Sequence, residues 1–217
     1  MILSPGRRFA FVHIPKTGGT AMALALEDRA MKDDILIGDT PKARRRKARL
    51  RHLTPPGRLW KHSRLADVEG VCDMTGWRIV TLVRNPWDRL VSYYHWLRAQ
   101  SFDHPAVALA QAHDFSGFLN HTQTRVSVAA QPYASYVTDR AGVPRATDFI
   151  RLEAFATDMA PVFAHLGFSF DLVRANASDR ARDWRGYYTD RDAALVAQLC
   201  VADIARSGYR FDPGQPG

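Results

Sequence analysis

The sequence has few cysteines and no long apolar run, and each scarcity excludes a class of protein. Cys72 and Cys200 are the only cysteines among 217 residues, too few for a disulfide framework and without the spacing of a metal site. No apolar stretch reaches the roughly 18 residues needed to cross a bilayer. The N-terminus lacks a basic region followed by an apolar segment and a small-residue cleavage site, so we expect no signal peptide. A reducing cytoplasm is therefore the expected compartment.

The net charge of +8 comes mostly from one short segment. Residues 42–51, "KARRRKARLR", hold seven basic side chains and no acid, so without them the net charge would be +1. A local cationic stripe suits an acidic partner such as a uronate-bearing or sulfated glycan, whereas many such runs are only solvated helix faces. Both interpretations stay open. No recognisable nucleic-acid fold motif accompanies the segment, so a nucleic-acid partner is not expected.

Apolar strands that alternate with helices predict the α/β class. With 46% hydrophobic and 24% charged residues, the composition fits a single folded domain over 1–217. Residues 9–14 and 77–83 are short apolar runs typical of buried strands, and helical patterns follow them at 18–30 and 86–99. We therefore expect a mostly parallel central sheet flanked by helices. The remaining expected elements are strands at 58–62 and 147–152 and helices at 41–54, 63–69, 153–165 and 190–205.

The stretch "HIPKTGGT", residues 13–20, joins the first expected strand to the first expected helix. Its glycines allow positive φ angles and close approach by a ligand, and the helix N-terminus adds N–H donors and positive potential. Lys16 adds a full charge, and Thr17 and Thr20 add hydroxyl donors. Such a P-loop-like strand–loop–helix site suits phosphate or sulfate, although an ordinary turn of this kind also uses glycines.

This loop departs from the nucleoside-triphosphate motif GxxxxGK[ST]. Its lysine precedes the glycines, and no Lys-Ser or Lys-Thr pair follows them to hold Mg²⁺. No acidic metal-binding motif follows the strand at 77–83, which leads instead into Arg84 of "LVRNPWDRLVSYY". We therefore expect no metal, and a phosphosulfate donor is favoured over a triphosphate.

Together, "HIPKTGGT" and "VRNPWDRLVSYY" resemble the paired signatures of sulfotransferases that use 3′-phosphoadenosine 5′-phosphosulfate (PAPS). The resemblance is greatest to the carbohydrate sulfotransferases and their small bacterial relatives. Weaker similarity through "FIRLEAF" and "YYTDRDAALVAQLCVADIARSGYRF" extends it to both ends of the chain. In that family the first motif holds the 5′-phosphosulfate. The resemblance therefore assigns this side of the donor to Lys16, Thr17, Gly18, Gly19 and Thr20.

The second motif holds the 3′-phosphate in that family, which assigns this group to Arg84 and Ser92. Helical spacing places Ser92 roughly opposite the apolar face of its helix, where it is expected to meet a ligand or solvent. A structural ion pair is the alternative role for Arg84. The chain also departs from the family pattern, since Ala21 stands where relatives often carry serine. The basic loop that often completes the 3′-phosphate site is not evident, and Arg182 and Arg185 are its candidates.

Sulfuryl transfer needs a cation beside the leaving phosphate oxygen and a base for the acceptor hydroxyl. Lys16 is the expected cation. His62 in "LWKHSRL" is the expected base, because it follows a short apolar run and is therefore expected at a strand end. The "KHS" there also resembles a lysine–histidine pair that lies between the two signatures of the family. A surface histidine beside Lys61 is the alternative interpretation, and His13 is the rival base.

Motifs and resemblance together imply a sulfotransferase. It would move the sulfuryl group of PAPS to a hydroxyl acceptor on a carbohydrate and release adenosine 3′,5′-bisphosphate (PAP). Two other classes stay open: a nucleotide or small-molecule kinase, and a non-catalytic polyanion-binding protein that uses residues 42–51. The three differ in whether the protein binds PAP, Mg-ATP or neither.

Overall fold

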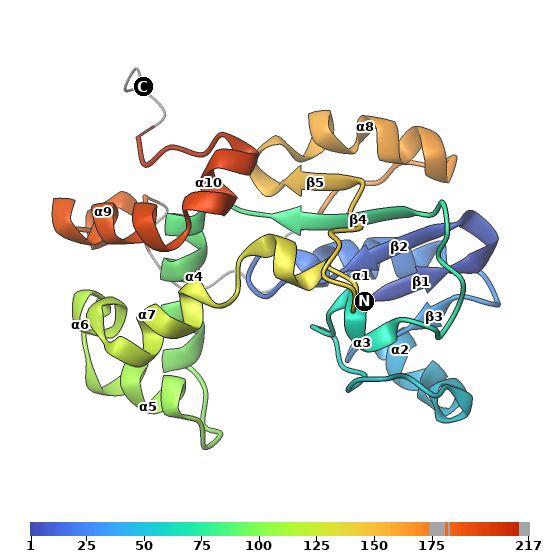
Figure 1. The fold of residues 1–217 in the computed structure, drawn as a ribbon, viewed down its shortest axis with the longest axis horizontal. Coiled ribbons are helices and arrows are strands. Elements are labelled where there is room, and N and C mark those ends of the chain that lie inside the picture. Colours follow the sequence, from blue (N-terminus) through green and yellow to red (C-terminus); the bar gives the residue numbers. More distant parts are fainter. Residues whose placement is uncertain (174–180, 182, 213–217) are drawn as a thin grey trace. The chain divides into compact units, whose positions relative to one another are not determined.

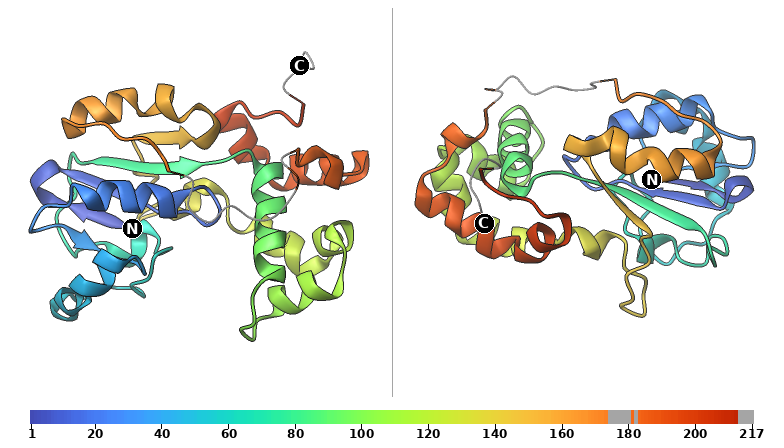
Figure 2. Two further views of the ribbon diagram at one scale, coloured as in Figure 1. Left: turned by 180° about the vertical axis from the view of Figure 1, so that it is seen from behind. Right: turned by 90° about the horizontal axis from the view of Figure 1, so that it is seen from above.

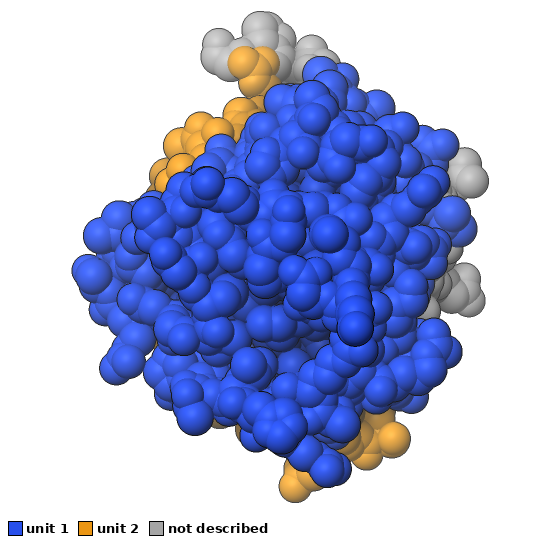
Figure 3. All heavy atoms as spheres, turned by 90° about the vertical axis from the view of Figure 1, so that its right-hand side faces the viewer, with its two compact units in different colours: residues 1–83, 133–175 blue, residues 84–132, 176–217 orange. Residues whose placement is uncertain are grey.

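The chain divides into two compact units in the computed structural model, which describes residues 1–173, 181 and 183–212. Unit 1 is formed by residues 1–83 and 133–175, and unit 2 by residues 84–132 and 176–217 (Figure 3). The five strands of the described sheet all lie in unit 1, with helices around them, so the predicted α/β class is confirmed. The single domain expected over 1–217 stays a prediction.

Unit 1 carries most of the elements foreseen from the sequence (Figure 1). Its strands are β1 (Ile2–Ser4), β2 (Phe9–Val12), β3 (Ile35–Leu36), β4 (Arg78–Val83) and β5 (Asp148–Arg151). Its α-helices are α1 (Gly19–Asp28), α2 (Pro41–Arg46), α3 (Leu65–Val68) and α8 (Phe155–Leu166). Its 3₁₀ helices are η1 (Pro5–Arg7), η2 (Lys47–His52), η3 (Tyr133–Tyr136) and η4 (Leu152–Ala154). The expected strands at 9–14, 77–83 and 147–152 are confirmed with slightly shorter bounds.

One predicted strand, 58–62, is wrong. This segment turns because Ser63 closes it locally: the Ser63 hydroxyl donates to the Arg58 carbonyl at 2.8 Å and accepts from the Trp60 N–H at 2.8 Å. The Ser63 N–H also donates to the Trp60 carbonyl at 3.0 Å. These bonds occupy backbone groups that a strand would offer to its neighbour, so His62 lies in a turn and not at a strand end.

The sheet is mixed, in the order β3-β1-β2-β4-β5. β2, β4 and β5 pair in parallel, while β1 is antiparallel to both β2 and β3. Since β1 alone opposes the others within this sheet, the expected mostly parallel arrangement is confirmed. Val12 at the end of β2 is level with Thr81, and Val83 at the end of β4 is level with Arg151. The carboxyl ends of these three parallel strands therefore share one edge of the sheet, where α/β proteins commonly bind ligands.

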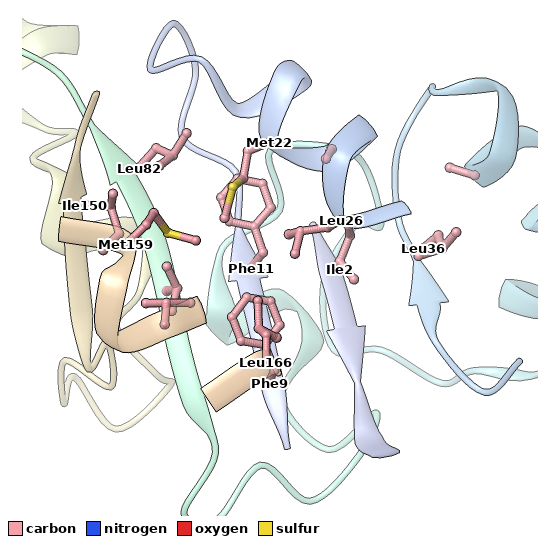
Figure 4. Packing of buried hydrophobic residues seen from close by; sticks show 14 residues of the cluster. Ile2, Phe9, Phe11, Met22, Leu26, Leu36, Leu82, Ile150, Met159 and Leu166 are labelled. Carbon is pink, nitrogen blue, oxygen red and sulfur yellow. The ribbon is translucent and has the colours of Figure 1, made fainter. Parts of the chain in front are cut away.

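Helices α1 and α8 bury one face of the sheet (Figures 2 and 4). Met22 and Leu26 from α1 and Met159 and Leu166 from α8 pack against side chains of the strands. The strand side chains in this cluster include Phe9, Phe11, Val80, Leu82 and Ile150. Residues that alternate with them are also buried, among them Ala10, Val12, Ile79 and Val83. Both faces of the parallel strands are therefore covered, as expected for strands with continuous apolar sequence.

Unit 2 is helical in its described part. It contains α4 (Pro86–Arg98), α5 (Pro105–Ala112), α6 (Phe115–Asn120), α7 (Thr122–Ala129), η5 (Arg185–Tyr187), α9 (Asp190–Leu199) and α10 (Val201–Ser207). The predicted helix at 86–99 is confirmed, whereas the one at 190–205 is split at Cys200. No helix among the described residues is both long enough and apolar enough to cross a membrane.

Helix α4 organises unit 2. The Asn85 side chain accepts a hydrogen bond from the Trp87 N–H at 3.1 Å, and Pro86 occupies the first helical position. Trp87 and Tyr94 are buried in a cluster shared with α5, α6 and α9, and the Trp87 indole donates to the Ala193 carbonyl at 3.0 Å. The local capping signals in the sequence are therefore sufficient to fix where this helix begins.

Candidate functional site

The loop from His13 to Gly18 follows β2 at the carboxyl edge of the sheet and leads into α1. Two of its residues have left-handed backbone, Lys16 with φ 67° and Gly18 with φ 87°. A side chain rarely takes this conformation, so the lysine is held there by the surrounding turn. The Thr17 hydroxyl donates to the Ile14 carbonyl at 2.9 Å, and this side chain is fully buried. This internal hydrogen bond therefore holds the loop in a closed turn.

The two glycines of the loop, Gly18 and Gly19, are required for different structural reasons. Gly18 needs its positive φ, and a Cβ there would also come 2.9 Å from Cδ1 of Leu152. Gly19 has no such φ requirement. Instead, a Cβ at Gly19 would lie 2.0 Å from Cδ2 and 2.4 Å from Nε2 of His13. The second glycine therefore makes room for the imidazole ring that packs beneath the start of α1.

This arrangement can hold a tetrahedral anion. The first N–H groups of a helix have no intrahelical partners, and no side chain among the described residues caps α1. These N–H groups and the positive end of the helix dipole attract phosphate or sulfate. Lys16 and Thr20 are both partly exposed at this end of the helix, whereas the Thr17 hydroxyl already serves the loop itself. Thr17 therefore offers a ligand its backbone rather than its side chain.

His62 belongs to the same unit and lies against the loop. Its Nδ1 is 3.0 Å from the carbonyl oxygen of His13, and the two imidazole centroids are 4.5 Å apart at an interplanar angle of 69°. Because a carbonyl can only accept, this hydrogen bond requires the proton on Nδ1, which leaves the lone pair of a neutral ring on Nε2. The Trp60 ring contacts His62 edge-on, with centroids 5.0 Å apart. The structure thus brings the expected base to the expected anion loop.

Both imidazoles are neutral at pH 7. Burial lowers the pKa of His62 to about 4, an effect that its hydrogen bond to the His13 carbonyl opposes and the nearby charge of Lys61 reinforces. Burial also lowers the pKa of His13 well below its usual value, with further contributions from His62, Lys61 and Lys16. The Lys61 ammonium pairs with Asp39 at 2.8 Å. A neutral His62 can accept a proton at physiological pH, although its basicity is weakened.

The residues expected at the 3′-phosphate lie in unit 2. Arg84 pairs with Asp88 one turn along the chain, its Nη2 2.6 Å and its Nε 2.8 Å from the same carboxylate oxygen. Ser92 is only 5% exposed, so the alternative of a solvated serine is wrong, and its contact with a ligand stays a prediction. Helix α4 is buried around most of its circumference, Ser92 included, and a one-sided apolar face is therefore a poor guide there.

Arg182 and Arg185 are the candidates for a C-terminal basic loop at the 3′-phosphate. Arg185 pairs with Asp183, Nε to Oδ1 at 2.9 Å, and with Asp212 at 3.5 Å. Arg182 lies outside the described residues.

The basic segment 42–51 forms helix α2 and then η2, with Thr40 as N-cap and Pro41 as first residue, as the sequence predicts. Three of its cations hydrogen-bond to backbone carbonyls at and after the C-terminal end of α1. Lys42 donates to Glu27, Arg46 to Met31 at 2.7 Å, and Arg49 to Lys32 at 2.7 Å. Cations are favourable at this negative end of a helix dipole. Part of the run therefore has a structural role that its composition did not reveal.

Arg44 and Arg45 are the contrast within the same helix. Both are exposed. Together with Lys47 and Arg51, which are also exposed, they remain suited to an acidic partner.

No cluster of three or more His, Cys, Asp or Glu side chains within the described residues could hold a metal ion. Cys72 and Cys200 are both free thiols.

Comparison with known proteins finds similarity among solved structures. No family model matches the sequence, and no curated protein matches it. Among solved structures, the chain is similar to the crystal structure of mouse sulfotransferase SULT7A1 complexed with PAP. The identity is 16%, the TM-score is 0.47, and the match covers 92% of this chain and 84% of that one.

Proposed function

We propose that this protein is a sulfotransferase that moves the sulfuryl group of PAPS to a hydroxyl, on a carbohydrate, and releases PAP. The observation that carries the proposal is the β2–α1 loop, where an uncapped helix start follows a left-handed, partly exposed Lys16 within one of the two sequence signatures. His62 against the same loop supplies a neutral base. The donor is a co-substrate, and the chemistry proposed for these side chains requires no metal.

The donor would be held at two groups. Lys16, Gly18, Gly19 and Thr20 would bind the 5′-phosphosulfate, with Thr17 contributing its backbone. Arg84 and Ser92 would bind the 3′-phosphate, a role that rests on their signature. Arg84 would then share its guanidinium between the phosphate and Asp88, which five N–H donors permit. All 217 residues would act as one domain.

In the proposed reaction the acceptor oxygen attacks sulfur as the bond from sulfur to the 5′-phosphate oxygen breaks. The hydroxyl proton passes to Nε2 of His62, and the electron pair of the broken bond stays on the phosphate of PAP. Lys16 stabilises the negative charge that develops there. The process is mainly one of positioning and charge stabilisation, as in phosphoryl transfer.

The proposed acceptor is an anionic carbohydrate, and the proposed compartment is the cytoplasm. Exposed Arg44 and Arg45 favour a carbohydrate that carries carboxylate or sulfate groups over a neutral one. The absence of any nucleic-acid motif argues for a glycan over a nucleic acid. Two free cysteines are consistent with the reducing cytoplasm.

Single-turnover sulfuryl transfer with saturating PAPS and acceptor tests the proposal. His62→Ala should lower the transfer rate about 10²–10⁴-fold, the usual effect of removing a positioned base, and leave PAP affinity nearly unchanged. Lys16→Ala should damage both donor binding and turnover, because its charge meets the phosphosulfate before and during transfer. Near-normal transfer by His62→Ala would show that His62 is not the base, which would then be His13, His95 or a carboxylate.

A further inference from the structure

His13 occupies the point where the strand, the anion loop and the candidate base meet. It is the first residue after β2, and its side chain is 5% exposed. Its ring lies over Phe11, with centroids 6.0 Å apart and planes inclined by 23°, and its Cδ2–Nε2 edge fills the space beside Gly19. The ring therefore forms a floor under the first residue of α1, whose N–H groups face the proposed anion.

The same residue contacts His62 in two ways. Its carbonyl oxygen accepts the hydrogen bond from Nδ1 at 3.0 Å, and its ring meets the His62 ring edge-on at 4.5 Å between centroids. Trp60 contacts His62 with its plane at 86° to the imidazole. The carbonyl thus fixes which nitrogen of His62 carries the proton, and the two aromatic neighbours limit how the ring can rotate.

We infer that His13 is a positioning residue for the transfer reaction: it holds His62 in the Nδ1-protonated tautomer and ties that orientation to the anion loop through Gly19. The inference rests on the proposed function and adds to it the atom that takes the proton and the residue that selects this atom. The surroundings favour neutral rings, since burial is the largest cause that lowers both pKa values and the N-terminal amino group and Lys61 act in the same direction on both rings. Two uncharged imidazoles can pack edge-on there without mutual repulsion.

Nitrogen-15 NMR of the histidine side chains tests the inference in the nucleotide-free protein near pH 7. Wild-type His62 should carry its proton on Nδ1. His13→Ala keeps the carbonyl that accepts from Nδ1 but removes the ring that packs against His62, and Gly19→Ala forces that ring to move. In both variants the His62 ring is held less firmly against the carbonyl, so both should show a mixture of His62 tautomers. Gly38→Ala is the matched control, because its Cβ would come no closer than 3.9 Å to a neighbour, Lys61 Cβ, and should leave the tautomer as in the wild type.

Measurement of kcat in the same variants gives a second test of the inference. His13→Ala and Gly19→Ala should lower kcat about 10²-fold, the scale of loss expected from misplacing a reacting group by about 1 Å. A proton on Nε2 of wild-type His62 would overturn the inference without any variant. Folded variants that keep both the wild-type tautomer and kcat would also overturn it. The tautomer measurement needs no donor, so it is distinct from a failure of the proposed function, which would appear as a wild-type protein that does not bind PAP.

Discussion

Arg84 and Asp88 form an ion pair across the first turn of α4, with both Nη2 and Nε of the arginine within 2.8 Å of one carboxylate oxygen. The pair occupies the start of the second sequence signature. It supplies the structural role that the sequence left open for Arg84, whereas the proposed role is a contact of the same guanidinium with the 3′-phosphate. The two roles make different predictions for nucleotide binding.

Arg84→Ala should mainly weaken PAP binding, because a charge-assisted contact to the 3′-phosphate is lost. Such a contact is worth about 1.5–3 kcal/mol. Adenosine 5′-phosphosulfate lacks the 3′-phosphate, so its affinity should hardly change. Isothermal titration of both nucleotides measures the difference, with Asp88→Ala as the variant that breaks the ion pair and keeps the arginine. Equal losses for both nucleotides in Arg84→Ala would make the arginine purely structural.

We expect the basic side chains of residues 42–51 to fall into two groups, one that contacts the acceptor and one that stabilises the fold. Reversing exposed Arg44 and Arg45 to glutamate should leave PAP affinity and stability intact but lower the rate on an anionic glycan, while sparing a neutral acceptor. Arg46→Ala should instead lower the free energy of unfolding by about 0.5–1.5 kcal/mol, because the hydrogen bond to the Met31 carbonyl is lost. If the doubly reversed variant keeps the wild-type rate on the anionic glycan, Arg44 and Arg45 are ordinary solvated cations with no role in acceptor binding.

His62 predicts an acid-sensitive stability. Its folded-state pKa of about 4 lies below its ordinary 6.5, so between these values the unfolded chain binds a proton that the folded chain does not. The stabilising contribution is complete above about pH 6.5 and is lost progressively as the pH falls toward 4, by up to about 3 kcal/mol. Urea unfolding across this window should show a smaller loss for His62→Asn than for the wild type. Parallel pH dependences in the two proteins would contradict the assignment.

The sequence predicted those parts of the fold that depend on local signals. Thr40 and Asn85 cap their helices as their residue types suggest, since each side chain reaches a nearby N–H in the first turn. The short β1 and β3 were not foreseen, because strands of three and two residues carry too little periodicity to detect. The turn at 58–62 was misread because apolar Leu59 and Trp60 resemble a strand, whereas the deciding group was the hydroxyl of Ser63.

The parts of the site that depend on local backbone conformation could be predicted from the sequence. The parts that depend on packing between distant segments could not. "PKTGG" indicates a loop for an anion, and the structure gives it left-handed residues and an uncapped helix start. The contact of His13 with Gly19 and the carbonyl bonds of Arg46 depend on elements brought together by the fold. The second glycine of "TGG", Gly19, was the sequence feature that could have pointed to this contact. In the structure it has no positive φ angle, so the absence of a side chain there serves packing and not backbone conformation.

The most direct test of the central claim compares PAP with Mg-ATP as ligands in a thermal-shift titration, with and without chelator. A ligand that binds only the folded protein, at about 100 times its Kd, adds about 2.7 kcal/mol of stability, which in a chain of this size raises Tm by roughly 5–10 °C. We predict a shift of this size for PAP, unchanged by chelator, and little for Mg-ATP. A shift with Mg-ATP that chelator abolishes, and none with PAP, would contradict the sulfotransferase account and favour a kinase. No shift with either nucleotide would contradict it equally and favour a polyanion-binding protein.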